Sequence, residues 1–316
     1  MKLVVLDPIY LNKRHIDKLK KIGRVFIFDG LPNTHDEILQ RVKDSDIIIT
    51  ASVDINGAIL KQCTSLKMIC LACSGHNRID LDICNELAII VTNVPSYATK
   101  AVAEHVFAFL LAIMKKIREG DEHVRKGRFN RREFRLMELN GKIFGIVGTG
   151  RIGTQVVRIA NSFGCKVIAH TLHPSIERAK KIGVSYVKLE KLLRESDIIS
   201  LHVSLNPSTV NLINYKEFRL MKKKPILINT SRGKVINHDA LVWALSKGKI
   251  CAAGLDVLPY EPPQRGDPLL KFPNIIFSPH NAFCTPEALE NCADTVIDNI
   301  ESFINAKPKN VVNSKN

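Results

Sequence analysis

An arginine, a glutamate and a histidine follow three strand-like segments in the C-terminal half of the chain, and these side-chain types suit one kind of chemistry. Arg232, Glu261 and His280 each come shortly after an apolar run. An arginine fork binds a carboxylate through two hydrogen bonds and keeps its charge. A histidine exchanges a proton near neutral pH, and a carboxylate beside it orients the ring and favours the protonated form. Such a set can hold a small carboxylic acid and protonate a group on it.

A glycine pattern upstream indicates what reacts with such an acid. Residues 142 to 153 read KIFGIVGTGRIG, so Gly148, Gly150 and Gly153 have the spacing G-x-G-x-x-G between a strand-like run and a helix-like stretch. The first glycine allows a tight bend, the second lets the backbone approach a pyrophosphate, and the third lets helix and strand pack closely. The helix N-terminus offers N–H groups and a partial positive charge to the phosphates. The pattern predicts a dinucleotide site.

Combined with that site, the three side chains predict hydride transfer between a nicotinamide cofactor and a small 2-keto or 2-hydroxy acid. Arg232 would bind the substrate carboxylate, His280 would exchange the proton, and Glu261 would orient the histidine. Each residue taken singly has a structural alternative: a salt bridge for the arginine, a satisfied turn position for the histidine, and a solvated loop position for the glutamate. Parallel strands bring their carboxyl ends to one edge, so the joint pattern favours a site.

The elements that must position these residues alternate along the whole chain, which is typical of parallel sheets wrapped by helices. Five strand-like runs lie at 2–7, 25–28, 47–50, 68–72 and 89–93, and six more lie near 143–148, 166–170, 197–203, 225–230, 251–257 and 275–280. A helical pattern separates the two sets over about 99–126, and a last helix is expected over about 285–304. We predict an α/β protein with two doubly wound parallel-sheet domains.

Composition limits the class of protein further. The chain has 316 residues, of which 45% are hydrophobic and 24% charged, so it is long enough for two separate cores. It starts on a strand-like run without a signal-like leader, and its apolar segments are too short to span a bilayer. Eight cysteines lie mostly in apolar surroundings, and the single Cys70-x-x-Cys73 pair lacks the partners of a zinc or redox site. We expect a cytoplasmic protein without a metal or a membrane partner.

The net charge of +15 raises the question of a nucleic-acid partner. Most lysines lie where solvated helix faces are expected, without interleaved aromatic residues for stacking on bases, so we expect no nucleic acid. One denser segment contains Arg125, Arg128, Arg131, Arg132 and Arg135. It is either a solvated connector or an anion-attracting rim of an active-site cleft.

Five stretches are similar to the motifs of the D-isomer-specific 2-hydroxyacid dehydrogenase family, which includes phosphoglycerate and glycerate dehydrogenases and hydroxypyruvate reductases. They are VTNVPSYATKAVAEH at 91–105, GIVGTGRIG at 145–153, INTSRGKVIN at 228–237, GLDVLPYEP at 254–262 and SPH at 278–280. The resemblance covers nearly the whole chain. It implies a flavodoxin-like substrate domain over 1–99 plus 283–316 and an inserted Rossmann domain over 100–282 that binds NAD(H) or NADP(H). It also implies a homodimer, with the long helix near the interface.

The resemblance also implies roles for individual residues. Arg232, Glu261 and His280 would be catalytic, and Ser74 and Gly75 would contact the substrate carboxylate. Asp256 would lie near the nicotinamide amide, and Arg151 and Ile152 would lie at the pyrophosphate. The remaining cofactor contacts are assigned to the three glycines of the turn and to residues that follow other strands: Thr171, His202, Val203, Thr230 and Ser231.

Two departures from the family pattern bear on specificity. Thr171 stands where NAD-dependent members carry an aspartate for the ribose hydroxyls, and His170, His173 or Arg178 can attract a 2′-phosphate, so the choice between NAD and NADP stays open. Arg78 lies where the family often has a different residue, and it either alters substrate preference or caps the next helix.

A binding protein on the same fold is the alternative function. The family includes a corepressor branch that senses the nucleotide, and there the basic surface would contact a partner. The first hypothesis leaves the acid open among hydroxypyruvate, glyoxylate, pyruvate and 3-phosphoglycerate.

Overall fold

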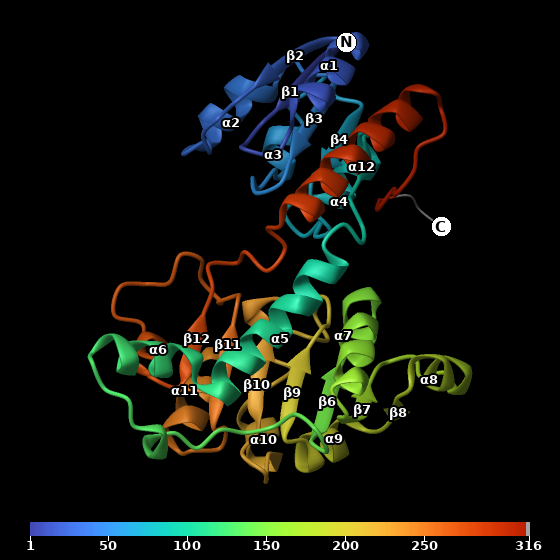
Figure 1. Cartoon of the computed structure of the whole chain (residues 1–316). Coiled ribbons are helices and arrows are strands. Elements are labelled where there is room, and N and C mark those ends of the chain that lie inside the picture. Colours follow the sequence, from blue (N-terminus) through green and yellow to red (C-terminus); the bar gives the residue numbers. More distant parts are fainter. Residues whose placement is uncertain (314–316) are drawn as a thin grey trace. The chain divides into compact units, whose positions relative to one another are not determined.

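The computed structural model describes residues 1–313, and the chain folds as two compact units. Unit 1 contains Met1–Ala98 and the chain from Cys284 onward, and unit 2 contains Thr99–Phe283. Figure 1 shows that each unit has a sheet of its own with helices around it.

Unit 1 is built on a five-stranded parallel sheet in the order β2-β1-β3-β4-β5. Its strands are β1 (Lys2–Val5), β2 (Arg24–Ile27), β3 (Ile47–Thr50), β4 (Met68–Leu71) and β5 (Ile90–Thr92). Alternate side chains of the strands enter two separate cores. One core is covered by α2 (His35–Val42), α3 (Gly57–Leu60) and α4 (Leu81–Glu86), the other by α1 (Lys13–Ile22) and α12 (Pro286–Ile304).

Unit 2 is built on a seven-stranded parallel sheet in the order β12-β11-β10-β9-β6-β7-β8. The strands are β6 (Ile143–Val147), β7 (Lys166–His170), β8 (Ser185–Tyr186), β9 (Ile198–Leu201), β10 (Ile226–Asn229), β11 (Ala252–Leu255) and β12 (Ile275–Phe277). One face packs on α5 (Thr99–Lys115), α7 (Arg151–Ser162) and α8 (Ile176–Ile182), the other on α9 (Leu189–Glu195), α10 (Tyr215–Leu220) and α11 (His238–Ser246).

Both strand orders agree with the predicted fold class. Unit 1 has the flavodoxin-like order, and unit 2 has the order of a dinucleotide-binding fold with one added strand, β12, at one edge. The prediction of two doubly wound parallel sheets is therefore confirmed. The prediction missed β8, because two residues are too few to show a strand pattern.

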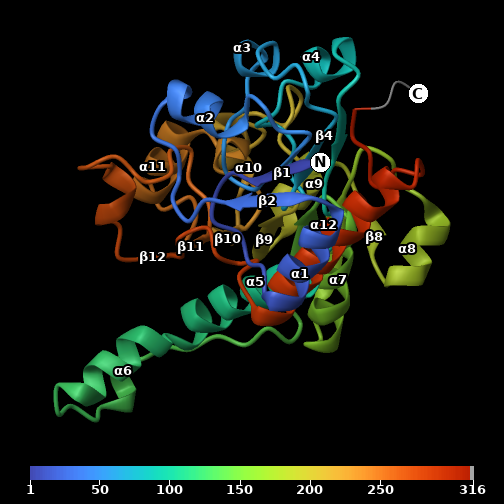
Figure 2. The same cartoon turned by 90° about the horizontal axis from the view of Figure 1, so that it is seen from above.

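The single helix expected over 99–126 is wrong in one respect, because the structure breaks it in two. α5 ends at Lys115, and α6 (Ile117–Arg125) begins after Lys116, whose backbone is left-handed with φ of 49°. A residue in that conformation cannot continue a right-handed helix. α6 therefore leaves the direction of α5 and projects from unit 2 (Figure 2).

Several helices begin at a residue whose side chain caps them. Asn12, Thr34, Asp80 and Thr285 each accept a hydrogen bond from the backbone N–H three residues on, at the starts of α1, α2, α4 and α12. Since Asp80 caps α4, the suggestion that Arg78 caps this helix is wrong. Arg78 instead forms an exposed ion pair with Asp54 at 3.3 Å.

Candidate active site

The glycine turn between β6 and α7 has the backbone that a dinucleotide site needs. Gly148 has φ of +94°, and a Cβ there would lie 2.6 Å from the carbonyl oxygen of His202. A Cβ at Gly153 would lie 2.0 Å from the Gly148 carbonyl oxygen. Both positions therefore need glycine, the first for its backbone angle and the second for close packing.

Gly150 differs from its neighbours because it borders open space. A Cβ built there meets no described atom within 4 Å. The first N–H groups of α7, from Arg151 on, have no acceptor within the helix, as at the start of any α-helix. Gly150 is the N-cap residue and has no side chain that could accept hydrogen bonds from them. Open space beside unpaired N–H groups fits the pyrophosphate of a bound dinucleotide.

The segment after β7 carries positive and neutral groups instead of a carboxylate. Thr171 follows His170 at the end of the strand, and Arg178 on α8 donates hydrogen bonds to the Thr149 carbonyl oxygen and to Thr154 Oγ1. The Arg178 guanidinium therefore lies at the glycine turn. Arg178 therefore offers a cation to a 2′-phosphate, and Thr171 offers no carboxylate to the ribose hydroxyls.

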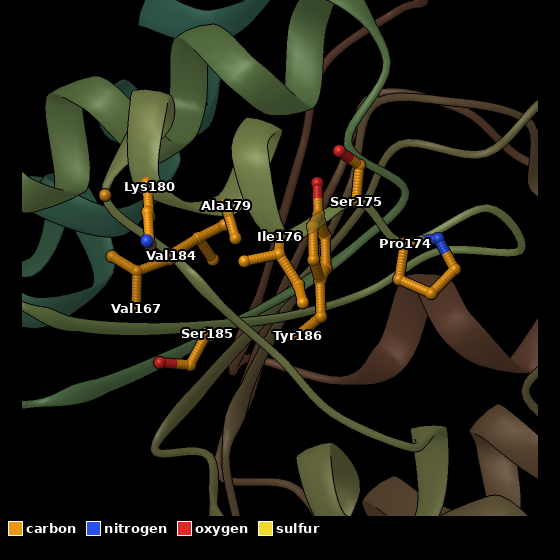
Figure 3. Close-up of a pocket in the computed structure, with 10 residues that line it drawn as sticks. Val167, Pro174, Ser175, Ile176, Ala179, Lys180, Val184, Ser185 and Tyr186 are labelled. Atoms are coloured by element: carbon orange, nitrogen blue, oxygen red, sulfur yellow. The ribbon is translucent and has the colours of Figure 1, made fainter.

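Two cavities lie beside α8. One of about 580 Å³ lies between β7, β8 and α8, where Val167, Ile176 and Tyr186 are among the lining side chains (Figure 3). Tyr186 also bonds Thr149 through its hydroxyl, at 2.9 Å. The other cavity, of about 610 Å³, is lined by the basic side chains of Arg151, Arg158, Arg178 and Lys181, with Glu177. Neither cavity includes the three predicted catalytic residues.

The end of β9 contributes a neutral histidine. His202 Nε2 lies 2.8 Å from the Ser200 hydroxyl, and burial lowers the pKa of His202 to about 3. Val203 follows, and one of its methyl groups would lie 3.0 Å from a Cβ at Gly148. This wall of the glycine turn is therefore uncharged near neutral pH.

The turn after β10 is held by one amide side chain. Asn229 Nδ2 donates to the Arg232 carbonyl oxygen at 2.9 Å, and Asn229 Oδ1 accepts from the Ser231 N–H and hydroxyl at 3.0 and 2.8 Å. Thr230 Oγ1 is buried without a hydrogen-bond partner among the described residues. A buried hydroxyl of this kind offers an unused bond to a ligand.

Arg232 presents a cation without a carboxylate partner. Its Nη1 donates to the Ser231 carbonyl oxygen at 2.7 Å, and within the described residues no ion pair joins Arg232 to an acidic side chain. The structural alternative of a salt bridge is therefore absent from the part of the chain that the structure describes.

Glu261 and His280 form a hydrogen-bonded pair. Glu261 Oε2 lies 2.7 Å from His280 Nδ1, and Oε1 accepts the Leu258 N–H at 2.9 Å. Burial raises the pKa of Glu261, but the hydrogen bonds from His280 and Leu258 and the charges of His280 and Arg232 outweigh it, so the pKa lies below its ordinary value. Glu261 is therefore a carboxylate near neutral pH. His280 Nε2 has no partner among the described residues.

The turn that carries His280 follows β12 and folds around Asp256. The Asp256 carboxylate accepts hydrogen bonds from Ser278 Oγ at 2.5 Å, from the Asn281 N–H at 2.9 Å and from the Ala282 N–H at 3.1 Å. Sequence reasoning named Asp256 only for the cofactor and did not single out Ser278 as a site residue. It also missed His105, whose Nε2 lies 2.9 Å from Ser278 Oγ. Both lie within the stretches quoted above, at 91–105 and 278–280.

In unit 1, Ser74 and Gly75 lie in the loop after β4. Ser74 Oγ donates to the Val94 carbonyl oxygen at 2.8 Å, and Asn93 Nδ2 donates to the Ser74 carbonyl oxygen at 2.8 Å. This loop is thus fixed to the segment after β5, at the carboxyl edge of the sheet. Unit 1 therefore holds the predicted substrate pair, and unit 2 holds the predicted catalytic and cofactor residues.

Two other clusters are explained by packing. His15, Glu290 and Asp294 lie close enough to hold a metal ion, but Arg14 Nη2 already lies 2.7 Å from both carboxylates, so the group ties α1 to α12 as an ion-pair network. Cys70 of the C-x-x-C pair is buried, and burial raises the pKa of its thiol to about 11. That thiol is protonated near neutral pH.

Over residues 1–313, the helices are all too short or too polar to cross a bilayer.

Unit 2 thus combines a glycine turn at the carboxyl edge of a parallel sheet, a histidine–carboxylate pair and an arginine without an ion pair among residues 1–313, as a dinucleotide-dependent oxidoreductase requires. Residues 107–282 match the family model described as D-isomer specific 2-hydroxyacid dehydrogenase, NAD binding domain. The chain belongs to the D-isomer specific 2-hydroxyacid dehydrogenase family. The family predicted from the motifs is thereby confirmed, as is dependence on a nicotinamide cofactor.

Individual relatives match most or nearly all of the chain. It is 34% identical to a hydroxypyruvate reductase of Blautia hydrogenotrophica over 99% of this chain and 100% of the relative. It is 39% identical to a glyoxylate reductase of Thermococcus litoralis over 87% of this chain and 86% of the relative. Among solved structures, an acyclic imino acid reductase in complex with NADPH and D-Arg superposes with a TM-score of 0.91 at 34% identity, covering 99% of this chain and 100% of the other.

Proposed function

We propose that the protein reduces small 2-keto acids to D-2-hydroxy acids with NAD(P)H, or catalyses the reverse oxidation. The observation that carries the proposal is the His280–Glu261 hydrogen bond of 2.7 Å in unit 2, where Arg232 forms no ion pair with any carboxylate of residues 1–313. Hydroxypyruvate, glyoxylate and pyruvate carry a carboxylate next to a carbonyl, and 3-phosphoglycerate carries a carboxylate next to the 2-hydroxyl that the reverse reaction would oxidise.

The chain's own residues supply binding and proton transfer. Arg232 binds the substrate carboxylate through two parallel N–H···O bonds, which fixes the position of the neighbouring carbonyl. A bound NAD(P)H supplies the hydride to the carbonyl carbon. His280 donates the proton from Nε2 to the carbonyl oxygen, so that the ketone becomes an alcohol, and it regains a proton from water afterwards. Glu261 orients the His280 ring through the hydrogen bond at Nδ1.

The cofactor and substrate contacts are part of the same proposal. Unit 2 binds the dinucleotide through the glycine turn with Arg151 and Ile152 at the pyrophosphate, and unit 1 contributes Ser74 and Gly75 to the substrate carboxylate. The open space at Gly150 and the unpartnered Thr230 hydroxyl support the first assignment. The other cofactor contacts proposed are Gly148, Gly153, Thr171, His202, Val203, Ser231 and Asp256.

A panel of acids tests the proposed reaction. Hydroxypyruvate, glyoxylate, pyruvate and 3-phosphohydroxypyruvate are offered to the purified protein with NADH and with NADPH, and loss of absorbance at the reduced cofactor's band is followed. We expect turnover of at least one acid. A parallel series adds an amine to each acid, because an imino acid presents the same carboxylate and differs only at the atom that His280 protonates. Failure of every acid, with a partner protein that co-purifies, would favour the corepressor-like alternative.

Replacing Thr171 with aspartate is expected to shift the cofactor preference toward NADH. The new carboxylate accepts a hydrogen bond from the ribose 2′-hydroxyl and repels a 2′-phosphate. A hydrogen bond to a charged group contributes about 1.5–3 kcal/mol, so the ratio of kcat/KM for NADH to that for NADPH should rise about 10- to 100-fold. Thr171→Val, which removes the hydroxyl without adding charge, is the matched control. An unchanged ratio in Thr171→Asp would place the ribose elsewhere.

A homodimer and a cytoplasmic location complete the proposal. The α6 region exposes Ile117, Val124, Phe129 and Leu136, with Phe129 92% exposed, and an apolar surface of this kind suits contact with a second copy. Within the same region Arg125 forms an ion pair with Asp121 at 2.8 Å.

The proposed cytoplasmic location is supported by the cysteines. Five of the eight are buried, which fits packing in a reducing compartment.

A further inference from the structure

A short chain of hydrogen bonds runs from α5 to the strand ends of unit 2. His105 Nε2 lies 2.9 Å from Ser278 Oγ, and Ser278 Oγ lies 2.5 Å from Asp256 Oδ1. The Asp256 side chain is only 2% exposed, and His105 Nε2 lies 3.9 Å from its carboxylate. The His105 ring also packs edge-to-face on Phe109, with ring centroids 4.7 Å apart. His105 therefore holds Ser278 from a fixed position on the longest helix of unit 2.

The direction of these hydrogen bonds follows from the number of protons. A serine hydroxyl has one proton, and at 2.5 Å from a carboxylate oxygen it must donate that proton to Asp256. Ser278 Oγ therefore accepts from His105, which requires a proton on His105 Nε2. Burial lowers the pKa of His105 more than the charge of Asp256 raises it, so the ring is neutral near pH 7 and carries its proton on Nε2.

The far end of the chain fixes the backbone around His280. Asp256 Oδ1 accepts the Asn281 N–H at 2.9 Å, and both carboxylate oxygens accept the Ala282 N–H at 3.1 and 3.2 Å. The His280 N–H donates to the Asp256 carbonyl oxygen at 2.9 Å. His280 itself has φ of 51°, a left-handed conformation that is unfavourable for a non-glycine residue. The bonds on both sides of His280 hold it in this conformation.

We propose that His105 is a positioning residue for the proton donor: its hydrogen bond to Ser278 completes the clamp of Ser278 and Asp256 that holds His280 against Glu261. This inference rests on the proposed function, because it assigns a role in the proton transfer described above. His105 touches the reacting atoms only through Ser278, Asp256 and the turn that carries His280. Its loss should therefore reduce the rate of the chemical step and leave cofactor binding unchanged.

Two replacements of His105 test the proposal. His105→Phe keeps the ring and its packing on Phe109 but removes the donor, and His105→Gln keeps an N–H donor at a similar reach. We expect His105→Phe to lower kcat about 10²-fold, the loss typical of a small misplacement of a catalytic group, with the Kd for NADH within twofold of wild type. The acid limb of the pH–rate profile should move to higher pH, because a displaced His280 lowers the pKa of Glu261 less. His105→Gln should restore both.

His123→Phe is the control for a purely structural effect. His123 is a buried histidine of unit 2 that packs edge-to-face on Phe134 and bonds the Asn130 N–H, with no bond to the turn at 278–282. Both His123→Phe and His105→Phe should lower the melting temperature. Only His105→Phe should move the pH–rate profile. A shifted profile in His123→Phe, a wild-type profile in His105→Phe, or equal losses in His105→Phe and His105→Gln would each overturn the proposal.

A measurement without turnover separates this inference from the proposed function. In the protein without substrate, nitrogen-15 NMR should find the neutral His105 ring protonated at Nε2. By carbon-13 NMR, the titration midpoint of the Glu261 carboxyl should rise in His105→Phe but not in His105→Gln, because a displaced His280 lowers the pKa of Glu261 less. A ring protonated at Nδ1, or a midpoint that does not move, would refute the positioning role even in an active enzyme. If the wild type turns over no 2-keto acid while these NMR results hold, the proposed function fails and the clamp remains.

Discussion

His280→Asn is expected to lower kcat for 2-keto acid reduction by about 10²–10⁴-fold, the contribution of a positioned general acid. Asparagine is preferable to alanine here, because His280 has φ of 51° and asparagine tolerates a left-handed backbone. The variant removes the proton donor without forcing the turn to rearrange. Steady-state rates with the best acid of the panel give kcat, and fluorescence titration gives the Kd for NADH, which should stay within a few-fold of wild type.

Glu261→Gln is the companion variant for this prediction. The amide keeps a hydrogen-bonding group beside His280 but removes the carboxyl that titrates, so the acid limb that Glu261 gives to the pH–rate profile should disappear. Because the pKa of Glu261 lies below its ordinary value, the stability that its interactions add to the folded protein is fully present above the ordinary pKa of a glutamate. That stability is lost as the pH falls through the lowered pKa.

A His280→Asn enzyme with kcat within tenfold of wild type would show that His280 is not the proton donor.

Arg232→Leu is the second change with a large expected effect. The variant loses two charge-assisted hydrogen bonds to the substrate carboxylate, each contributing about 1.5–3 kcal/mol, so kcat/KM should fall roughly 10²–10⁴-fold, mostly through KM. Arg232→Lys keeps the charge but not the fork and should recover only part of the loss. The charge of Arg232 also lowers the pKa of Glu261, so removing it should move the acid limb of the profile to higher pH.

The control for Arg232 is another arginine of the same unit. Arg219 on α10 lies over the Trp243 ring at 5.4 Å, away from the glycine turn in sequence, and Arg219→Leu should leave kcat/KM unchanged. A substrate control is the methyl ester of the same keto acid, which lacks the carboxylate charge. Wild type should discriminate strongly against the ester, and Arg232→Leu should treat acid and ester alike. Equal discrimination in both proteins would place the carboxylate elsewhere.

Much of the architecture could be predicted because strands and helix starts leave recognisable patterns over a few neighbouring residues. Parallel strands buried on both faces appear as short apolar runs, and the caps at Asn12, Thr34 and Asp80 mark helix starts by their own side-chain chemistry. The break at Lys116 and the strand β8 could not be predicted in the same way. The first depends on one residue's backbone angle and the second is two residues long, so neither leaves a periodic pattern.

The candidate site likewise contains residues that the sequence pointed to and contacts that it did not. Gly148, Gly150 and Gly153 were identifiable because each acts within one turn, and Arg232, Glu261 and His280 were identifiable because each follows a strand whose carboxyl end must join a common edge. Composition and spacing were enough to argue against a metal site at Cys70 and Cys73, but they left two interpretations of the basic segment at 125–135 open. Contacts between side chains far apart in the chain could not be predicted from local patterns.

The sequence by itself determined the fold class, the dinucleotide turn and the residue types available for acid–base chemistry, because these depend on periodicity and on neighbours along the chain. Only the tertiary structure decided which atoms meet. It placed Glu261 Oε2 2.7 Å from His280 Nδ1, left Arg232 without an acidic partner among the described residues, and joined His105 to Asp256 through Ser278 across 151 positions of the chain. Hydrogen bonds form over about 3 Å, and contacts between residues so far apart in sequence exist only once the sheet and helices have packed.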